Sequence, residues 1–288
     1  MTSLRISHRT TYRYNRPVHL NPHRLMLRPR ESRELRLVSM NVSITPKAKV
    51  VWARDVSDNW VATVEFSADT TQLEIESTAA IELNATAWPI FPVATSALNF
   101  PFNYDDDEWT DLGALATPLH ADSGGRLRDW AQAFVRGNPT DTLSLLKDIN
   151  AGISTWVAYQ AREDEGTQSP LETLDRRLGS CRDFAVLFVG AVRSLGFGAR
   201  IVSGYLHMTS PTTLGSAEGG STHAWAEVYV PGAGWITFDP TNHSVGGANL
   251  IPVAVGRDIA HVMPVSGSFV GMSDAYLGMT VEVKVNPS

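Results

Sequence analysis

The residue of this chain best suited to nucleophilic chemistry is its single cysteine, Cys181. It stands near the start of GSCRDFAVLFVGAVRSLGFGAR, residues 179–200, just before a run that is apolar on most faces from Phe184 to Leu195. Such a run predicts a buried helix with the cysteine at its N-terminus. The first turn of a helix presents unpaired N–H groups and partial positive charge, which favour the nucleophilic thiolate. The alternative is a small buried hydrophobe, the usual role of a free cysteine.

A histidine and an aspartate farther along the chain could activate this thiol. His223 lies at the start of the strand-like run THAWAEVYV, and Asp239 lies at the end of the next one, GWITFDP. The intervening PGAG predicts a turn that brings the far ends of the two strands together. His223 lies farther from this turn than Asp239 does, so a bulge or a wider turn has to absorb the difference. In such a set the imidazole takes the thiol proton, and the carboxylate orients the imidazole.

Three other residues are candidates for lining the site. Trp225 shares a strand face with His223, where it either shields the imidazole from water or belongs to the ordinary core. Tyr159 is a candidate second oxyanion donor beside the backbone N–H of the cysteine, against the default of a core tyrosine. Asn242 follows the aspartate and is a candidate for lining the cleft. No segment has the His/Cys spacing of a zinc site or a phosphate-binding glycine loop, so neither metal nor cofactor is expected.

The elements that must position these residues predict two parts. Residues 1–103 consist of β-rich runs and predict a β domain, whereas residues 104–288 predict helices followed by an antiparallel sheet with C-terminal strands, an α+β pattern. The acidic stretch NYDDDEW, residues 103–109, predicts a solvated linker. The Gly/Ser/Thr-rich residues 207–222 predict a surface loop. Apolar residues at helical spacing predict helices within 122–137, 140–160 and 169–178, the last with Ser169 as N-cap and Pro170 as first helical residue.

The composition of the chain argues against several classes of protein. The net charge of −6 and the pI near 5.7 give no basis for nucleic-acid binding. No apolar run reaches the length of a membrane span and the N-terminus is polar, so we expect no membrane association and a cytoplasmic protein. A single cysteine excludes an intramolecular disulfide and fits a reducing compartment.

The motifs around these residues resemble the bacterial transglutaminase-like family, which belongs to the papain-like cysteine peptidase superfamily. The boxes CRDFA, HAW and FDPTN occur in that order, followed by the tail GRDIAHVMPVSGSFVG. The first 100 residues, with LRISHRTTYRYNRPV and NPHRLMLRPR, resemble the N-terminal β domain of the same family. The resemblance implies a papain-like transglutaminase core with Cys181 as nucleophile, His223 as general base and Asp239 as orienting acid.

This machinery forms a thioester with a peptide or amide carbonyl and releases an amine. The sequence therefore predicts cysteine-dependent acyl transfer on a peptide or protein amide substrate, and we expect hydrolysis rather than transamidation. The alternative is a non-catalytic binding or scaffolding protein on the same fold, whose β domain presents partners or forms a homo-oligomer. A thiol redox sensor is a weaker third hypothesis, because the chain has no second cysteine to resolve a sulfenic acid.

Overall fold

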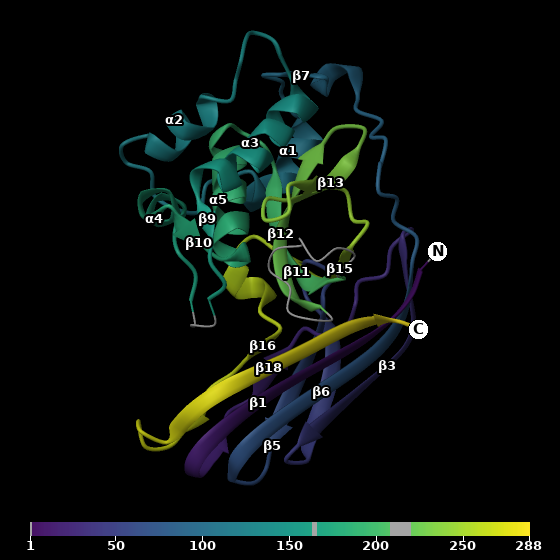
Figure 1. Ribbon diagram of the computed structural model, residues 1–288, viewed down its shortest axis with the longest axis vertical. Helices are drawn as coiled ribbons and strands as arrows, with labels where there is room; N and C mark the ends of the chain where they lie inside the picture. The colour runs from purple at the N-terminus through teal and green to yellow at the C-terminus, as the bar shows by residue number, and fades with distance from the viewer. Residues whose placement is uncertain (1, 163–165, 208–219) are drawn as a thin grey trace.

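The computed structural model, which describes residues 2–162, 166–207 and 220–288, stacks a helix-rich body on a body of β-sheets (Figure 1). The two ends of the chain lie close together, and the Ser288 N–H donates to the Ser3 carbonyl at 2.9 Å. The mixture of elements confirms the predicted α+β class with a β-rich N-terminal part. The predicted loop at 207–222 lies mostly outside the described residues, and its last two residues begin a strand.

A five-stranded antiparallel sheet forms the centre of the helix-rich body, in the order β14–β13–β12–β11–β15. The predicted PGAG turn is confirmed, because Val230 pairs with Gly234 on its two sides. Helix α5 (Cys181–Ser194) packs on β12 and β11, burying the apolar run that the sequence marks. The strands are β11 (Ala199–Leu206), β12 (Ser221–Val230), β13 (Gly234–Asp239), β14 (Ser244–Val245) and β15 (Leu250–Gly256).

The other helices surround α5 at the positions that the apolar spacing predicts. Ser169 caps α4 as expected, since its side chain accepts the Glu172 N–H at 3.2 Å. Asp141 caps α3 in the same way by accepting the Ser144 N–H at 2.7 Å. These helices are α2 (Arg126–Gln132), α3 (Thr142–Trp156) and α4 (Pro170–Arg176), with the 3-10 turns η1 (Thr95–Ala97), η2 (Gly113–Leu115) and η3 (Ile259–Val262). Two short pairs complete the body: β7 (Asn99–Phe100) with β8 (Thr140–Asp141), and β9 (Ala158–Tyr159) with β10 (Leu178–Gly179).

The acidic stretch 103–109 is not a simple linker, because helix α1 (Asp106–Leu112) begins within it. Asp105 accepts the Glu108 N–H at 2.7 Å, and the Glu108 side chain returns to the Asp105 N–H. This capping box, with acidic side chains beside the positive end of the helix, stabilises the helix start. The prediction of a solvated loop was wrong because it interpreted the charges as solvation rather than as capping.

Two sheets build the β body and enclose their own apolar core. One contains β1 (Thr2–Leu20) between β6 (Thr70–Leu83) and β18 (Tyr276–Pro287), with β3 (Leu35–Thr45) beyond β6 and β17 (Phe269–Val270) beside the end of β1. The other has the order β16 (Val265–Ser266), β2 (His23–Leu25), β5 (Trp60–Phe66) and β4 (Ala48–Arg54). Strands β4 and β5 form an antiparallel hairpin, from Ala48 opposite Phe66 to Arg54 opposite Trp60.

The C-terminal strands belong to the sheets of the β body. Strand β18 pairs antiparallel with β1, from Leu4 opposite Pro287 to Tyr14 opposite Tyr276. The sequence expectation grouped these strands with residues 104–288, and the observed pairing corrects that grouping. Without β18, the long strand β1 would present a row of unpaired backbone groups at the sheet edge.

The two bodies share a continuous apolar core and a few buried polar contacts. Leu4 and Ile6 of β1 pack in the same cluster as Phe184 and Phe188 of α5. Across the junction the His8 ring contacts the Tyr205 hydroxyl at 3.0 Å, and burial lowers the pKa of His8 to about 4, which keeps that ring neutral near pH 7. The β body is therefore joined to the sheet that carries the candidate site.

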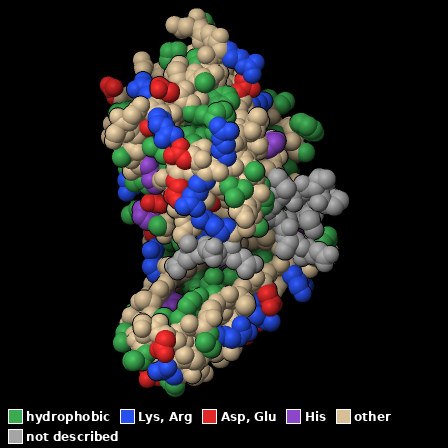
Figure 2. Space-filling view, turned by 60° about the vertical axis from the view of Figure 1, so that its left-hand side comes forward, with side chains coloured by type: hydrophobic (Ala, Val, Ile, Leu, Met, Phe, Trp, Pro, Cys, Tyr) green, Lys and Arg blue, Asp and Glu red, His purple; other side chains and the backbone are tan. Residues whose placement is uncertain are grey.

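The described surface mixes charges of both signs. On the face shown in Figure 2, Lys and Arg side chains alternate with Asp and Glu side chains rather than gathering into a basic patch. Among residues 2–162, 166–207 and 220–288, no helix combines the length and apolar character needed to cross a bilayer.

Candidate active site

Cys181 is the first residue of α5, as the sequence predicts, and its side chain is partly exposed. The backbone before it is fixed by a capping box in which Asp183 accepts the Ser180 N–H and hydroxyl, both at 2.8 Å. Cys181 therefore lies at the positive end of a 14-residue helix, with first-turn N–H groups beside its sulfur.

Asp183 is also the centre of a buried network that the sequence does not reveal. Its carboxylate, 0 % exposed, accepts two bonds from the Arg162 guanidinium, at 2.9 and 3.1 Å, and one from the Gln168 N–H at 2.7 Å. The segment before α4 is thereby tied to the first turn of α5. The spacing of Ser180 and Asp183 is typical of a capping box, so the sequence indicates the cap. The sequence near Asp183 does not indicate its ion pair with Arg162, which lies 21 residues away.

The hairpin of β12 and β13 brings His223 and Asp239 together. The His223 Nε2 lies 2.9 Å from the Asp239 Oδ2, and both side chains are buried. The pairing of β12 with β13 runs from Val230 opposite Gly234 to Ala226 opposite Phe238, and Asp239 is the last residue of β13. No register shift interrupts these pairs, so the bulge expected from the sequence is absent from them.

Four hydrogen bonds hold the Asp239 carboxylate. Besides the contact with His223, Oδ1 accepts the N–H groups of Thr241 at 3.0 Å and Asn242 at 3.3 Å, and Oδ2 accepts the Asn242 side-chain amide at 2.9 Å. Burial alone would raise the pKa of Asp239, but the His223 charge and these bonds hold its pKa below the usual value. Asn242, predicted to line the cleft, thus holds this carboxylate through both its backbone and its side-chain amide.

The thiol of Cys181 and the imidazole of His223 are coupled. Burial acts to lower the pKa of His223, yet the adjacent Asp239 carboxylate outweighs it and raises that pKa to about 10. Burial acts to raise the pKa of Cys181, but the positive charge of His223 and the Ala224 N–H lower it overall. Because Nε2 is engaged by Asp239, Nδ1 is the ring nitrogen left for the sulfur. At neutral pH this arrangement favours a thiolate–imidazolium pair.

Comparisons with known proteins agree with this geometry. Residues 4–82 match the bacterial transglutaminase-like N-terminal region, and residues 128–240, which contain all three residues, match the transglutaminase-like superfamily. Residues 128–240, the part of the chain that carries the site, are therefore transglutaminase-like. Together with the cysteine at the helix start, this match indicates a papain-like, cysteine-based activity in general.

Relatives of this transglutaminase-like chain span its full length. The uncharacterized protein ML0607 of Mycobacterium leprae is 25% identical over 98% of this chain and 99% of its own. The uncharacterized protein Rv2569c of Mycobacterium tuberculosis is 29% identical over 97% of this chain and 91% of its own. A solved candidate cysteine protease from Cytophaga hutchinsonii has the same fold, with a TM-score of 0.75 and 21% identity over 100% of this chain and 91% of that protein.

In the transglutaminase-like core, Trp225 covers one side of the imidazole. The ring centroids of Trp225 and His223 are 6.0 Å apart and nearly parallel, at 26°. Trp225 also packs against Val202 and Leu250, so the two expected roles, shield and core residue, coincide. Gly204 makes room for it, because a Cβ there would lie 2.8 Å from the Trp225 ring.

Tyr159 lies next to the segment that leads into α5. The parallel pairing of β9 with β10 sets Tyr159 opposite Gly179, two residues before Cys181, and its ring packs edge-on against Phe184 at 6.1 Å. Burial raises the pKa of Tyr159 to about 12, and the negative charges of Cys181 and Asp239 add to this effect. The hydroxyl therefore stays protonated and able to donate a hydrogen bond.

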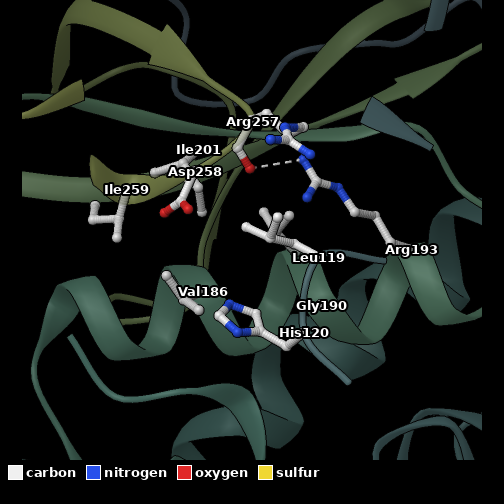
Figure 3. A pocket seen from close by; sticks show the side chains of 10 residues that line it. Leu119, His120, Val186, Gly190, Arg193, Ile201, Arg257, Asp258 and Ile259 are labelled. Carbon is white, nitrogen blue, oxygen red and sulfur yellow. Dashed lines mark hydrogen bonds between the residues drawn. The ribbon is translucent and has the colours of Figure 1, made fainter. Parts of the chain in front are cut away.

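A small cavity on another part of α5 does not belong to this site (Figure 3). Its walls include Val186, Gly190 and Arg193 of α5 together with His120 and Asp258. Its accessible space of about 20 Å³ would hold little more than one water molecule. The described residues contain no cluster of His, Cys, Asp and Glu side chains with the geometry of a metal site.

Proposed function

We propose that this protein is a cysteine-dependent acyl-transfer enzyme that acts on peptide or amide carbonyls through a thioester, with hydrolysis as the main outcome. The observation that carries the proposal is the contact of 2.9 Å between His223 Nε2 and Asp239 Oδ2. This contact leaves the buried Nδ1 of the same imidazole without a hydrogen-bond partner among the described residues, and the charge of the imidazole lowers the pKa of Cys181. An imidazole held between a carboxylate and a thiol is arranged to ionise the thiol and later to donate its proton.

In the first half-reaction, the Cys181 thiolate attacks the carbonyl carbon and forms a carbon–sulfur bond. The carbon–nitrogen bond then breaks, and the imidazolium of His223 gives its proton from Nδ1 to the leaving amine. Asp239 holds the ring by Nε2 throughout and stabilises its cationic form. The first-turn N–H groups of α5 stabilise the oxyanion, with the Tyr159 hydroxyl as the second donor that we propose.

In the second half-reaction, neutral His223 takes a proton from water as the water oxygen attacks the thioester carbon. A carbon–oxygen bond forms, the carbon–sulfur bond breaks, and the thiolate–imidazolium pair is restored. A primary amine in place of water would give transamidation by the same steps. Trp225 limits access of water to one side of the imidazole, but Cys181 itself is partly exposed, which supports water as the acceptor.

The second candidate is a binding or scaffolding protein on the same fold. The observation that favours it is the β body, which shares a core with the helix-rich body and has no part in the steps above. A scaffold, however, has no need of a buried carboxylate that accepts four hydrogen bonds beside an imidazole and a thiol. We therefore rank acyl transfer first.

The test is an unbiased screen of peptide and amide substrates with the purified full chain, in which hydrolysis and incorporation of a primary amine are measured in parallel by mass spectrometry. We expect products of amide hydrolysis to exceed amine adducts. A hydroxylamine-sensitive acyl adduct should be found on Cys181, the only cysteine of the chain.

Cys181→Ser serves as the matched variant, since it keeps the shape of the helix start and removes the strong nucleophile. It should lose at least about a thousandfold of the turnover. Equal turnover by the wild type and this variant would favour the binding protein. The same conclusion would follow if neither protein turned over any substrate while deletion of the β body abolished a cellular phenotype.

A further inference from the structure

An aromatic pocket lies at the opposite end of α5 from Cys181. It is formed where the chain leaves this helix, at Leu195, Gly196 and Phe197, and it has an accessible volume of about 400 Å³. Because α5 has 14 residues and a helix rises about 1.5 Å per residue, the pocket is roughly 20 Å from the thiol. A pocket of this size is within the range of ligand sites. It is lined by Phe100, Pro101, Phe102, Asn103, Tyr104, Trp109, Leu195, Gly196 and Phe197.

The aromatic walls of this pocket are packed against one another. Phe100 stacks on Phe197 at 5.4 Å, and Phe102 meets the same ring edge-on at 5.6 Å. Tyr104 is fixed by its hydroxyl, which donates to the Tyr229 carbonyl at 2.8 Å and accepts the Gly198 N–H at 3.0 Å. These side chains are therefore held in place before a ligand binds, so binding would not carry the entropic cost of ordering them.

Trp109 forms the open side of the pocket. Its indole stacks against Tyr104 at 6.4 Å and 29°, yet Trp109 remains 52% exposed. A half-exposed tryptophan beside a hollow offers a ring face to a ligand that is itself only partly enclosed. This degree of opening suits a side chain that projects from a polypeptide better than a free small molecule, which such sites usually surround.

The charge around Trp109 is negative. Residues 86–125 contain six acidic side chains and neither lysine nor arginine. Asp105 and Asp106 precede Trp109 by four and three positions, which places them on its side of α1. Among the described residues, neither carboxylate forms a salt bridge. An occupant of this pocket would therefore gain from positive charge.

Other tryptophans of the fold show which cation suits such a ring. Arg200 lies over Trp235 at 4.1 Å, Arg177 over Trp156 at 4.8 Å, and Trp60 has two guanidiniums over it, at 4.8 and 5.2 Å. No described cation occupies this position over Trp109. The planar guanidinium stacks on aromatic rings and also pairs with carboxylates, whereas the compact ammonium of lysine does this less well.

We propose that this pocket is a second binding site, which takes an arginine side chain of a polypeptide. The guanidinium lies on the Trp109 ring, the carboxylates of Asp105 and Asp106 neutralise it, and the neighbouring side chains of the peptide contact Pro101 and Phe102. The site does not depend on the chemistry at Cys181, so binding is measurable whether or not the protein is an acyl-transfer enzyme.

The experiment is an isothermal titration of the full chain with two acetylated, amidated pentapeptides that differ at the centre, one with arginine and one with its neutral isostere citrulline. We expect saturable binding of the arginine peptide and about tenfold weaker binding of the citrulline peptide, because the cation–π and carboxylate contacts are lost. Raising the salt concentration should weaken only the arginine peptide, since the interaction is partly electrostatic.

Variants locate the binding. Trp109→Leu and, separately, Asp106→Asn should each weaken the arginine peptide severalfold, and Asp106 is chosen because Asp105 caps α1. Trp88→Leu, at another exposed tryptophan that does not line the pocket, is the control and should bind as the wild type does. Absence of saturable binding, equal affinity for both peptides, or full binding by both pocket variants would overturn the proposal.

Discussion

His223→Ala should lower the turnover of an amide substrate by about ten thousandfold, in line with the loss of one member of a triad that acts as a unit. Two effects add in this variant: the thiol loses the cation that stabilises its ionised form, and the leaving amine loses its proton donor. The Michaelis constant should change much less, because the imidazole is buried and takes part in chemistry rather than in substrate contact. The measurement is steady-state hydrolysis of the best peptide from the screen.

His120→Ala is the matched control for that prediction. His120 is an exposed histidine that lines the small cavity along α5 and does not act on the pKa of Cys181. Turnover by this variant should stay within a few fold of the wild type. If both alanine variants lost activity equally, or His223→Ala kept most of it, the proposed role of His223 as general base and acid would be wrong.

Asp183→Asn should lower the free energy of unfolding by about 3 kcal/mol, the lower end of the cost of breaking a buried ion pair. The buried carboxylate accepts bonds from Ser180, Gln168 and Arg162, and an asparagine can satisfy only part of this set. We use the lower value because the Arg162 side chain is 24% exposed and water can partly solvate it. Equilibrium unfolding in urea measures the change.

Asp175→Asn provides the contrast. Asp175 also pairs with an arginine, Arg126, but both side chains are more than half exposed, so its loss should leave the unfolding midpoint almost unchanged. Asp183→Asn should in addition slow the chemistry at Cys181, because the cap that fixes the helix start is weakened. Equal unfolding midpoints for the two variants would show that the buried network does not hold α5 in place.

Local signals in the sequence were sufficient for the elements that carry the site. The unbroken apolar run after Cys181 indicates a buried helix, and the turn residues between the two strands indicate their pairing, because both depend on neighbours in the chain. The contact between His223 and Asp239 was expected only with a bulge or a wider turn, because the register of the two strands cannot be derived from the distance of each residue from the turn.

Contacts between distant segments could not be predicted in this way. The bond of Arg162 to Asp183 and the pairing of β18 with β1 join segments that no periodicity links. The family resemblance covered the three site residues but said nothing of these contacts. The acidic composition of residues 103–109 predicted a solvated loop, whereas Asp105 and Glu108 form the capping box at the start of α1.

The most direct test of the central claim is the pH dependence of Cys181 alkylation by iodoacetamide. The chain has one cysteine, so the adduct reports on this thiol alone. The pKa of Cys181 is lowered and that of His223 is raised to about 10, so the thiolate should form below the usual thiol range and persist as an ion pair up to about pH 10. We therefore predict a rate that is already high at neutral pH, then a plateau, then a second rise near pH 10 when the imidazolium loses its proton. A single rise centred near pH ~8.5, the value of an ordinary thiol, and unchanged in His223→Ala would contradict the account.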